Sequence, residues 1–424
     1  MDLIDLLSCN IYYVCSMDPL KEKPAILSLQ YHSYPDAMGG AWNLTHAINK
    51  RLVDRGYRVV LITCKPEEKL LDREIVDGVE FDRIPNALSK NPIRLWFAIR
   101  KRIKKYLIED EPWIAHVHNP LVGAFAIAIK KYRKIPKIYH FHSSWYDEEK
   151  INLTETNEVA INLYVRLKII RWLEWVCYHY SKSILFLSDY TRKRFLNYFP
   201  FRKPRMRIIP GGTDIEKFCP SENTNEINEI RKKLGIPNGY KFLLTVRRLE
   251  ARMGLDNLIT AIAEIVNQSP ELKFKLVIAG KGSLEGRLKS QVMLTGLDNH
   301  IHFSGFVPDE FLPKYYAAAD IFIMPTEFIE GFGIATVEAL SSGLPVIGTP
   351  IGGTTEILES IDKKLLFKDE KAKSMAEKIE WFLKTPDYIF SLRSKCREEA
   401  LKKYSWDLVT DRVEEELKLI WGKK

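Results

Sequence analysis

The sequence predicts an α/β protein with two domains, each built around a mainly parallel β-sheet. Its 424 residues are too many for one hydrophobic core and suit two domains of about 200 residues each. Both halves begin with an apolar strand pattern, a loop and an amphipathic helix, and residues 320–356 repeat strand, loop, helix and strand. This alternation is typical of parallel sheets, which place ligands at the carboxyl ends of their strands.

Composition and charge narrow the classes of partner. The formal net charge is +9 and the pI is near 9.0, which favours anionic partners such as phosphorylated small molecules, anionic lipid or nucleic acid. No compact nucleic-acid-binding module is evident, so we expect no nucleic acid partner. Six scattered cysteines without CxxC spacing predict reduced thiols in a cytoplasmic protein, with neither disulfides nor a zinc site.

The first half opens on a β-loop-α-β pattern. No stretch is apolar enough to span a membrane and the first 16 residues lack the pattern of a secretory signal, so residues 1–23 are expected to form an extension. A buried strand is predicted at Pro24–Gln30, and a helix runs from Ala41 to about Arg55. The loop between them contains Gly39 and Gly40, which indicates a close backbone approach although G-x-G-x-x-G is absent.

One helix of this half carries an unusual charge pattern. Residues 93–108 contain six basic residues and no acidic one, with apolar positions at helical spacing. Packing on the core of the domain explains the apolar positions. Docking on an anionic membrane surface is the alternative, and a second basic and aromatic stretch at residues 163–180 adds to it.

Histidines mark two further predicted strands. WIAHVHNP (113–120) and KIYHFHSSW (137–145) place them near the carboxyl ends of parallel strands, where ligands bind. We expect His116, His118 and His140 to be packing or loop residues. Their spacing is interpreted as alternating between strand faces, so no metal site is predicted.

The second half carries the strongest signal, between Asp320 and Glu356. A short apolar strand, IFIM, precedes the turn Glu330-Gly331-Phe332-Gly333, and a helix follows and closes on Gly343. The turn amides and the helix N-terminus form a natural anion seat. Carboxylates suit hydroxyls better than phosphate, so Glu330 and Glu338 indicate a sugar and a ribose on either side of a diphosphate. Two ordinary surface glutamates are the plainer interpretation of an isolated pair.

The surrounding motif favours the first interpretation. P-T-x(3)-E-G-F-G-x(4)-E-A-L-x-x-G-L-P-V-I resembles the donor-site signature of the family 4 glycosyltransferases, and the resemblance extends over residues 24–421. It implies a GT-B fold, in which two Rossmann-like domains with parallel sheets face a central cleft. It also implies an acceptor-side domain at 24–212, a donor domain at 213–403, and a helix at 404–424 that crosses back.

The resemblance also implies site residues. Glu330, His142 and Arg248 match the catalytic positions of the family. The donor-binding positions that it implies are Gly39, Gly40, Arg248, Arg252, Glu330, Phe332, Gly333, Ile334 and Glu338. Two departures stand out: Gly211 replaces the usual asparagine, and Met253 replaces a lysine that contacts the diphosphate. Arg252 is the nearest replacement cation in sequence.

The implied activity is that of a retaining hexosyltransferase without metal or cofactor. It uses a UDP-, GDP- or ADP-linked sugar and a glycan, lipid-linked or small-molecule acceptor, in the cytoplasm or peripherally on the inner face of the membrane. Leaving-group charge would be stabilised by Arg248 and the turn amides. A sugar-nucleotide epimerase and a non-catalytic sugar-nucleotide-binding subunit are the alternatives. A donor hydrolysis assay distinguishes the enzyme hypotheses from the non-catalytic subunit.

Overall fold

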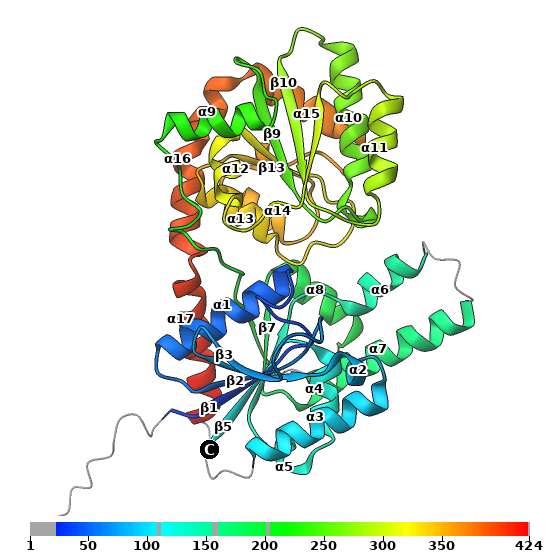
Figure 1. Cartoon of the computed structure of the whole chain (residues 1–424), viewed down its shortest axis with the longest axis vertical. Coiled ribbons are helices and arrows are strands. Elements are labelled where there is room, and N and C mark those ends of the chain that lie inside the picture. The colour runs from blue at the N-terminus through cyan, green and yellow to red at the C-terminus, as the bar shows by residue number, and fades with distance from the viewer. Residues whose placement is uncertain (1–22, 108–111, 155–159, 201–203, 423–424) are drawn as a thin grey trace, which may run out of the picture.

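A computed structural model describes residues 23–107, 112–154, 160–200 and 204–422 (Figure 1). Two α/β domains lie one above the other, each with its own sheet and with helices on both faces. The mixed α/β architecture with parallel sheets is therefore as predicted. The expected extension at 1–23 falls outside the described residues except for Lys23.

The N-terminal sheet has eight strands in the order β3-β4-β2-β1-β5-β6-β7-β8. All of its pairs are parallel except β3 with β4. The strand order reverses between β1 and β5, so the loops after these two strands flank a crevice. The strands are β1 (Ala25–Leu29), β2 (Val59–Cys64), β3 (Arg73–Val76), β4 (Val79–Ile84), β5 (Trp113–Val117), β6 (Lys137–Phe141), β7 (Ser183–Phe186) and β8 (Arg205–Ile208).

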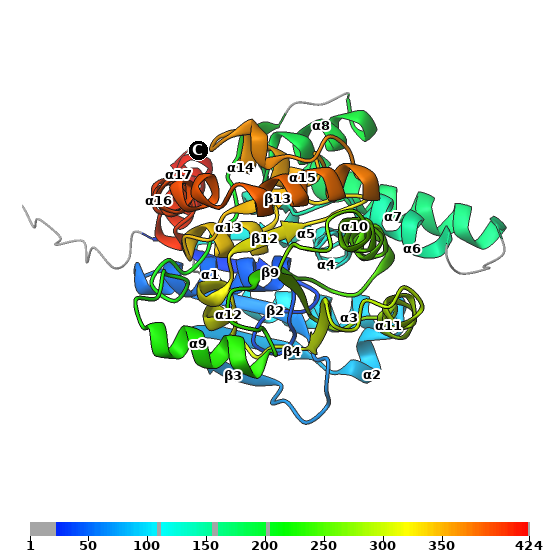
Figure 2. The ribbon, with the colours of Figure 1, turned by 90° about the horizontal axis from the view of Figure 1, so that it is seen from above.

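Two helices of this domain, α3 and α4, begin at asparagine caps. Asn91 and Asn119 each accept two backbone N–H bonds and are each followed by proline at the first helical position. The helices are α1 (Gly40–Asp54), α2 (Asn86–Ser89), α3 (Pro92–Tyr106), α4 (Pro120–Ile127), α5 (Lys130–Lys134), α6 (Trp145–Thr154), α7 (Ala160–Tyr180) and α8 (Asp189–Tyr198). The far ends of α6 and α7 project together from the body of the protein (Figure 2).

The C-terminal sheet has five parallel strands in the order β11-β10-β9-β12-β13. Its order reverses between β9 and β12, so the loops after these strands flank the crevice on this side. The first loop contains residues 247–250 and the second contains Glu330. The strands are β9 (Lys241–Val246), β10 (Phe274–Ala279), β11 (Ile301–Gly305), β12 (Ile321–Met324) and β13 (Val346–Gly348).

Helices and two 3₁₀ turns surround this sheet and lead to the C-terminus. They are α9 (Thr224–Lys233), η2 (Ala251–Met253), α10 (Leu255–Gln268), α11 (Glu285–Leu294), α12 (Leu312–Ala318), α13 (Ile334–Ser341), α14 (Gly353–Glu359), η3 (Lys363–Leu365), α15 (Ala372–Lys384), α16 (Pro386–Lys403) and α17 (Trp406–Gly422). None of the helices in the described part of the chain is both long and apolar enough to cross a membrane.

The last helix, α17, packs against the N-terminal domain. Arg55, the residue directly after α1, pairs with Asp411 at 2.7 Å and Glu414 at 3.1 Å. The fully buried Glu416 accepts a hydrogen bond from Ser183 on β7 and pairs with Arg205 on β8. The chain therefore returns to the first domain after the second domain is complete, and α17 connects the two domains.

Candidate functional site

A cleft of about 460 Å³ lies between the two domains. The first domain lines it with the loop after β1, the start of α1, and the loop after β6. The second domain contributes the loops after β9 and β12 and the start of α13. Its walls include Gly39, Gly40, His142, Glu148, Arg247, Arg248, Arg252, Met253, Glu330, Gly331, Phe332, Gly333, Ile334 and Glu338.

The turn after β12 presents the start of α13 to this cleft. Gly333 precedes the helix with φ +98°, a left-handed conformation that strains other residues, and a Cβ atom there would lie 2.5 Å from the Thr354 hydroxyl. No hydrogen bond from a described side chain caps this helix end. The first backbone N–H groups are therefore available to an anion, as the turn pattern predicts.

The Gly39–Gly40 loop faces this helix from the opposite domain. A Cβ atom on Gly40 would lie 3.4 Å from Cδ1 of Ile334, the first residue of α13. The position agrees with a loop that covers the phosphates of a donor. That role stays a prediction.

Arg247 also lines this cleft, and the sequence interpretation did not include it. Its side chain is 3 % exposed, and its Nη2 donates to Oε2 of Glu330 at 3.0 Å. Nη1 donates to the hydroxyl of Thr326 at 2.7 Å. Burial lowers the pKa of Arg247 to about 10, against the opposing effect of Glu330, so the guanidinium is charged at neutral pH. The signal for this residue was the first arginine of the VRRLE motif, directly before Arg248.

The guanidinium of Arg247 also lies beside Met253, the residue that replaces the lysine of the family motif. Its Nη2 lies 3.0 Å from the Met253 sulfur, at the position where the family resemblance implies a cation. Arg252, the replacement named from sequence, lines the cleft but donates to the Ile329 carbonyl at 3.0 Å. Arg248 is exposed and also lines the cleft. The site thus has three arginines, of which only Arg247 contacts Glu330.

His142 lies where the two domains touch. A Cβ atom on Gly331 would lie 2.4 Å from the His142 carbonyl oxygen, so the glycine permits this approach. Ser188, at the start of α8, donates to the Gly331 carbonyl at 2.8 Å. These contacts hold the turn that carries Glu330 against the end of β6.

Glu338 and Phe332 complete the second-domain wall. Glu338 accepts a 2.9 Å hydrogen bond from Tyr316, and burial raises the pKa of its carboxyl to about 7. Phe332 is buried, and a Cβ atom on Gly211 would lie 2.6 Å from its ring. The ring of Phe332 therefore leaves no room for a side chain at residue 211, which explains why glycine replaces the usual asparagine there.

The histidines of β5 and β6 differ from their predicted arrangement. We expected spacing that alternates strand faces, and that interpretation is wrong. Residues two apart point to the same face of a strand. His116 and His118 therefore share a face, as do His140 and His142, and the two pairs lie side by side in the sheet.

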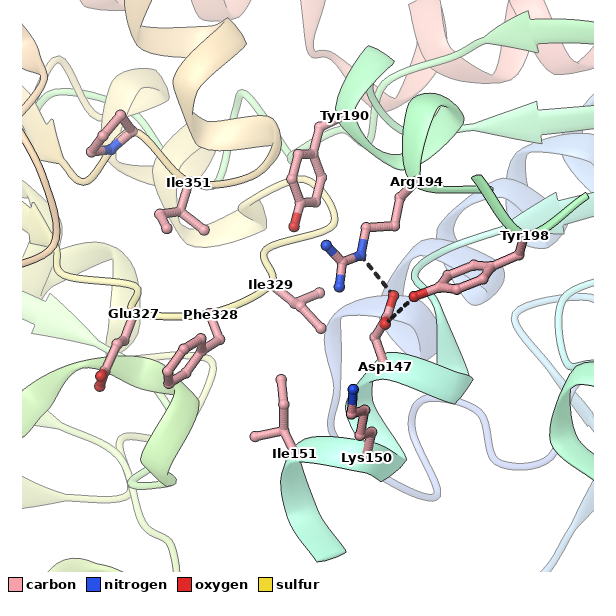
Figure 3. A pocket seen from close by; sticks show the side chains of 11 residues that line it. Asp147, Lys150, Ile151, Tyr190, Arg194, Tyr198, Glu327, Phe328, Ile329 and Ile351 are labelled. Carbon is pink, nitrogen blue, oxygen red and sulfur yellow. Dashed lines mark hydrogen bonds and ion pairs between the residues drawn. The ribbon is translucent and has the colours of Figure 1, made fainter. Parts of the chain in front are cut away.

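A second cavity of about 460 Å³ adjoins the cleft (Figure 3). Residues 327–329 of the turn after β12 form one wall, while α6 and α8 form the opposite one. Arg194 and Lys150 face the hollow. Arg194 donates through Nε to Asp147 at 2.7 Å, which holds its position on α8.

Two family models match this chain. The model described as Glycosyltransferase Family 4 matches residues 38–217, and the one described as Glycosyl transferases group 1 matches residues 226–403. Together they cover both domains and meet near the crossing between them.

Individual relatives and solved structures agree with these matches. An uncharacterised glycosyltransferase of Methanocaldococcus jannaschii is 24 % identical over 91 % of this chain and 95 % of its own length. Mannosylfructose-phosphate synthase of Agrobacterium fabrum is 28 % identical over 82 % of this chain and 80 % of its own. The structure of sucrose-phosphate synthase from Thermosynechococcus elongatus aligns with a TM-score of 0.78 at 20 % identity, covering 95 % of this chain and 100 % of its own. Anabaena HepE, solved with UDP and glucose, aligns at 0.73 and 21 % identity, covering 93 % and 100 %.

Proposed function

Because this chain belongs to the family 4 glycosyltransferases and has their GT-B fold, we propose that it transfers a sugar from a nucleoside-diphosphate donor with retention at the anomeric carbon. The observation that carries the proposal is the Arg247–Glu330 pair beside the uncapped start of α13, with His142 across the cleft. The UDP bound to Anabaena HepE supports the donor class.

In the proposed reaction the donor diphosphate lies over the start of α13. Its negative charge meets the helix N-terminus together with Arg248 and Arg247. Sugar hydroxyls donate to Glu330. The bond from the anomeric carbon to the diphosphate breaks, and the acceptor oxygen bonds the same face of the sugar. The acceptor proton passes to the leaving phosphate oxygen.

The counter-charge in this mechanism comes from the protein, so no metal ion is required at the diphosphate. Donor identity and metal dependence are tested together by a thermal-shift panel of UDP-, GDP- and ADP-sugars with and without EDTA. We expect one donor to raise the melting temperature of the protein equally with and without EDTA. We also expect donor hydrolysis to continue in EDTA. A shift that depends on added Mg²⁺ or Mn²⁺ would overturn metal independence. Binding without any hydrolysis or transfer would indicate a non-catalytic subunit.

Glu338 is proposed to accept the ribose hydroxyls. Glu338→Ala should raise the donor KM roughly 10-fold with little change in kcat, because the ribose is bound alike in ground and transition states and a hydrogen bond to a charged group is worth about 1.5–3 kcal/mol. The carboxyl has a pKa of about 7, so it is neutral below that pH and ionised above it. Since the ionised form accepts two hydroxyls, the wild-type donor KM should fall as pH rises from 6 to 8.

Glu338→Gln is the matched control, since its amide does not titrate and its donor KM should be independent of pH over the same range. A loss confined to kcat, or a pH dependence that persists in the glutamine variant, would contradict the ribose role.

The second cavity is proposed to bind the acceptor (Figure 3). It adjoins the donor cleft through the turn at 327–330. Its wall combines two cations with two acids and apolar side chains; these are Lys150, Arg194, Asp147, Glu327, Ile151, Phe328 and Ile329. Arg194 donates to Asp147 through Nε and also faces the hollow. Such a lining suits an acceptor that carries a negatively charged group as well as a hydroxyl.

Arg194→Gln should therefore raise the acceptor KM about 10-fold and leave the donor KM unchanged, because one charge-assisted contact to the acceptor is lost. Initial rates with anionic and neutral acceptors measure this effect. Arg192→Gln, on the same helix and paired with Asp189, is the control. An equal acceptor KM in wild type and Arg194→Gln would place the acceptor elsewhere.

Peripheral membrane contact is proposed for the exposed faces of α3 and α7. Both helices have solvent-exposed large apolar side chains, at Ile93, Phe97, Val165, Ile169 and Trp172. The same helix α3 also buries Leu95, Ile99 and Ile103, so core packing and surface exposure occur on its two sides. Its basic residues would meet anionic headgroups.

We expect the protein to co-sediment with phosphatidylglycerol vesicles and not with phosphatidylcholine vesicles. Ile169→Ser combined with Trp172→Ser should lower the bound fraction several-fold, because burial of large apolar side chains is lost. Phe390→Ser, at an even more exposed apolar site on α16, serves as control. Equal binding to both kinds of vesicle, or no effect of the α7 variant, would contradict a docking face here.

A further inference from the structure

Four imidazoles gather in the interior of the N-terminal domain beneath the cleft. His116 and His118 extend from β5 and its end, and His140 and His142 from β6 and its end. Their ring centroids are 3.9 Å apart for His116 and His118, 4.7 Å for His140 and His142, and 5.4 Å for His118 and His140. Adjacent parallel strands with matching spacing bring them together on one face of the sheet.

Most of their nitrogens lack a hydrogen-bond partner among the described residues. Both ring nitrogens of His116 and of His140, together with Nε2 of His118, are buried without one. These three side chains are between 0 and 4 % exposed. A buried polar group without a partner costs about 1–3 kcal/mol, so five such nitrogens in one place call for a ligand.

The geometry and chemistry of these nitrogens suit a transition metal ion. Ligand atoms of His116, His118 and His140 all lie within 4.8 Å of one another. Two nitrogens bound to one ion at about 2.1 Å are at most about 4.2 Å apart, so small side-chain rotations complete the set. Burial holds the pKa of all three imidazoles far below the ordinary value, which keeps them in the neutral form that binds metal.

Candidate oxygen ligands lie on the neighbouring strand β1 and on α1. Ser28 on β1 pairs in register with His116, and its hydroxyl accepts a 3.0 Å hydrogen bond from Asn49 on α1. The side-chain oxygen of Asn49 is itself buried without a partner among the described residues. A three-histidine set with an oxygen or water as fourth ligand is a usual coordination for Zn²⁺ and Co²⁺.

We propose that His116, His118 and His140 bind one divalent transition metal ion of the Zn²⁺ or Co²⁺ type. The ion would stabilise the domain from within the sheet, apart from the donor diphosphate. The proposal does not rest on the transfer reaction.

Binding would also orient His142. Nδ1 of His118 lies 3.2 Å from Nε2 of His142, while Nε2 of His118 is one of the free nitrogens. With Nε2 bound to metal, a neutral His118 carries its proton on Nδ1 and donates it to His142. His142 then has its own proton on Nδ1. The metal would thus fix the tautomer of a residue that lines the donor cleft.

The test uses the full-length chain, stripped with a strong chelator in mild denaturant, refolded, and loaded with Zn²⁺ or Co²⁺ before gel filtration. We expect about one ion per chain by mass spectrometry, visible Co²⁺ absorption typical of tetrahedral coordination, and a melting temperature raised by several degrees with metal. His118→Gln and His140→Gln should each lose most of the ion. His302→Gln, in the other domain, should retain it.

X-ray absorption at the zinc edge of the wild-type protein covers the case in which the variants do not fold, and an imidazole shell is the expected result. Folded wild-type protein that takes up no metal would overturn the proposal and leave water as the partner of these nitrogens. Equal metal content in wild type and His118→Gln would also overturn it. Metal content, Co²⁺ absorption and melting temperature are all measured without donor or acceptor, so failure here is distinct from failure of the proposed function.

Discussion

Glu330→Gln should leave the chain folded and lower kcat/KM by about 10²–10³, the usual cost of one preorganised group that stabilises transition-state charge. An amide accepts through one oxygen only and carries no charge, so it bonds sugar hydroxyls less well and does not stabilise positive charge at the anomeric carbon. It also presents no charge to Arg247, which lies 3.0 Å from the carboxylate. Initial rates at saturating acceptor, with circular dichroism for the fold, measure the effect.

Glu359→Gln, an exposed change on α14, is the matched control and should retain wild-type rates. Wild-type turnover by folded Glu330→Gln would reject the assignment of the turn after β12 as the donor site. A variant that no longer folds would be replaced by Glu330→Asp, which keeps the charge but withdraws it by one methylene.

Arg247→Met should cost about 3 kcal/mol of transition-state stabilisation, or roughly 10²-fold in kcat/KM. The guanidinium is almost fully buried between Glu330, Thr326 and Met253. Its removal leaves Glu330 without its cation and the diphosphate with one positive charge fewer. Arg247→Lys keeps the charge but loses the planar fork, so it should recover only part of the activity.

The competing candidate for the second cation is Arg252. If Arg252 holds the diphosphate, Arg252→Ala should cost about 2–3 kcal/mol of transition-state stabilisation. Met253→Lys added to Arg252→Ala should then restore part of the lost activity. If Arg247 holds the diphosphate instead, Arg252→Ala and Met253→Lys should each have a small effect. Arg287→Met, at an exposed arginine, is the control.

A double-mutant cycle of Arg247→Met with Glu330→Gln should be strongly non-additive, because the two side chains are in contact. Additive losses would show that Arg247 acts independently of Glu330.

Much of the fold followed from local pattern. The strand IFIM, the glycine turn and the helix that follows are readable because apolar periodicity and glycine positions are properties of neighbouring residues. The family motif around Glu330 extends over one such unit, so the sequence by itself determined the fold class, the family and the position of the turn that carries Glu330.

Contacts between segments distant in sequence were decided by the tertiary structure. Arg247 and Glu330 are 83 residues apart and meet because β9 and β12 are neighbours in the sheet, with their loops at one edge. The substitution at Met253 is matched in space by this buried arginine and not by the residue next to it in sequence. The histidines of β5 and β6 likewise become one cluster only because the two strands pair in parallel register. Side-chain periodicity states which face a residue occupies, but only strand order and register state which other residue it meets there.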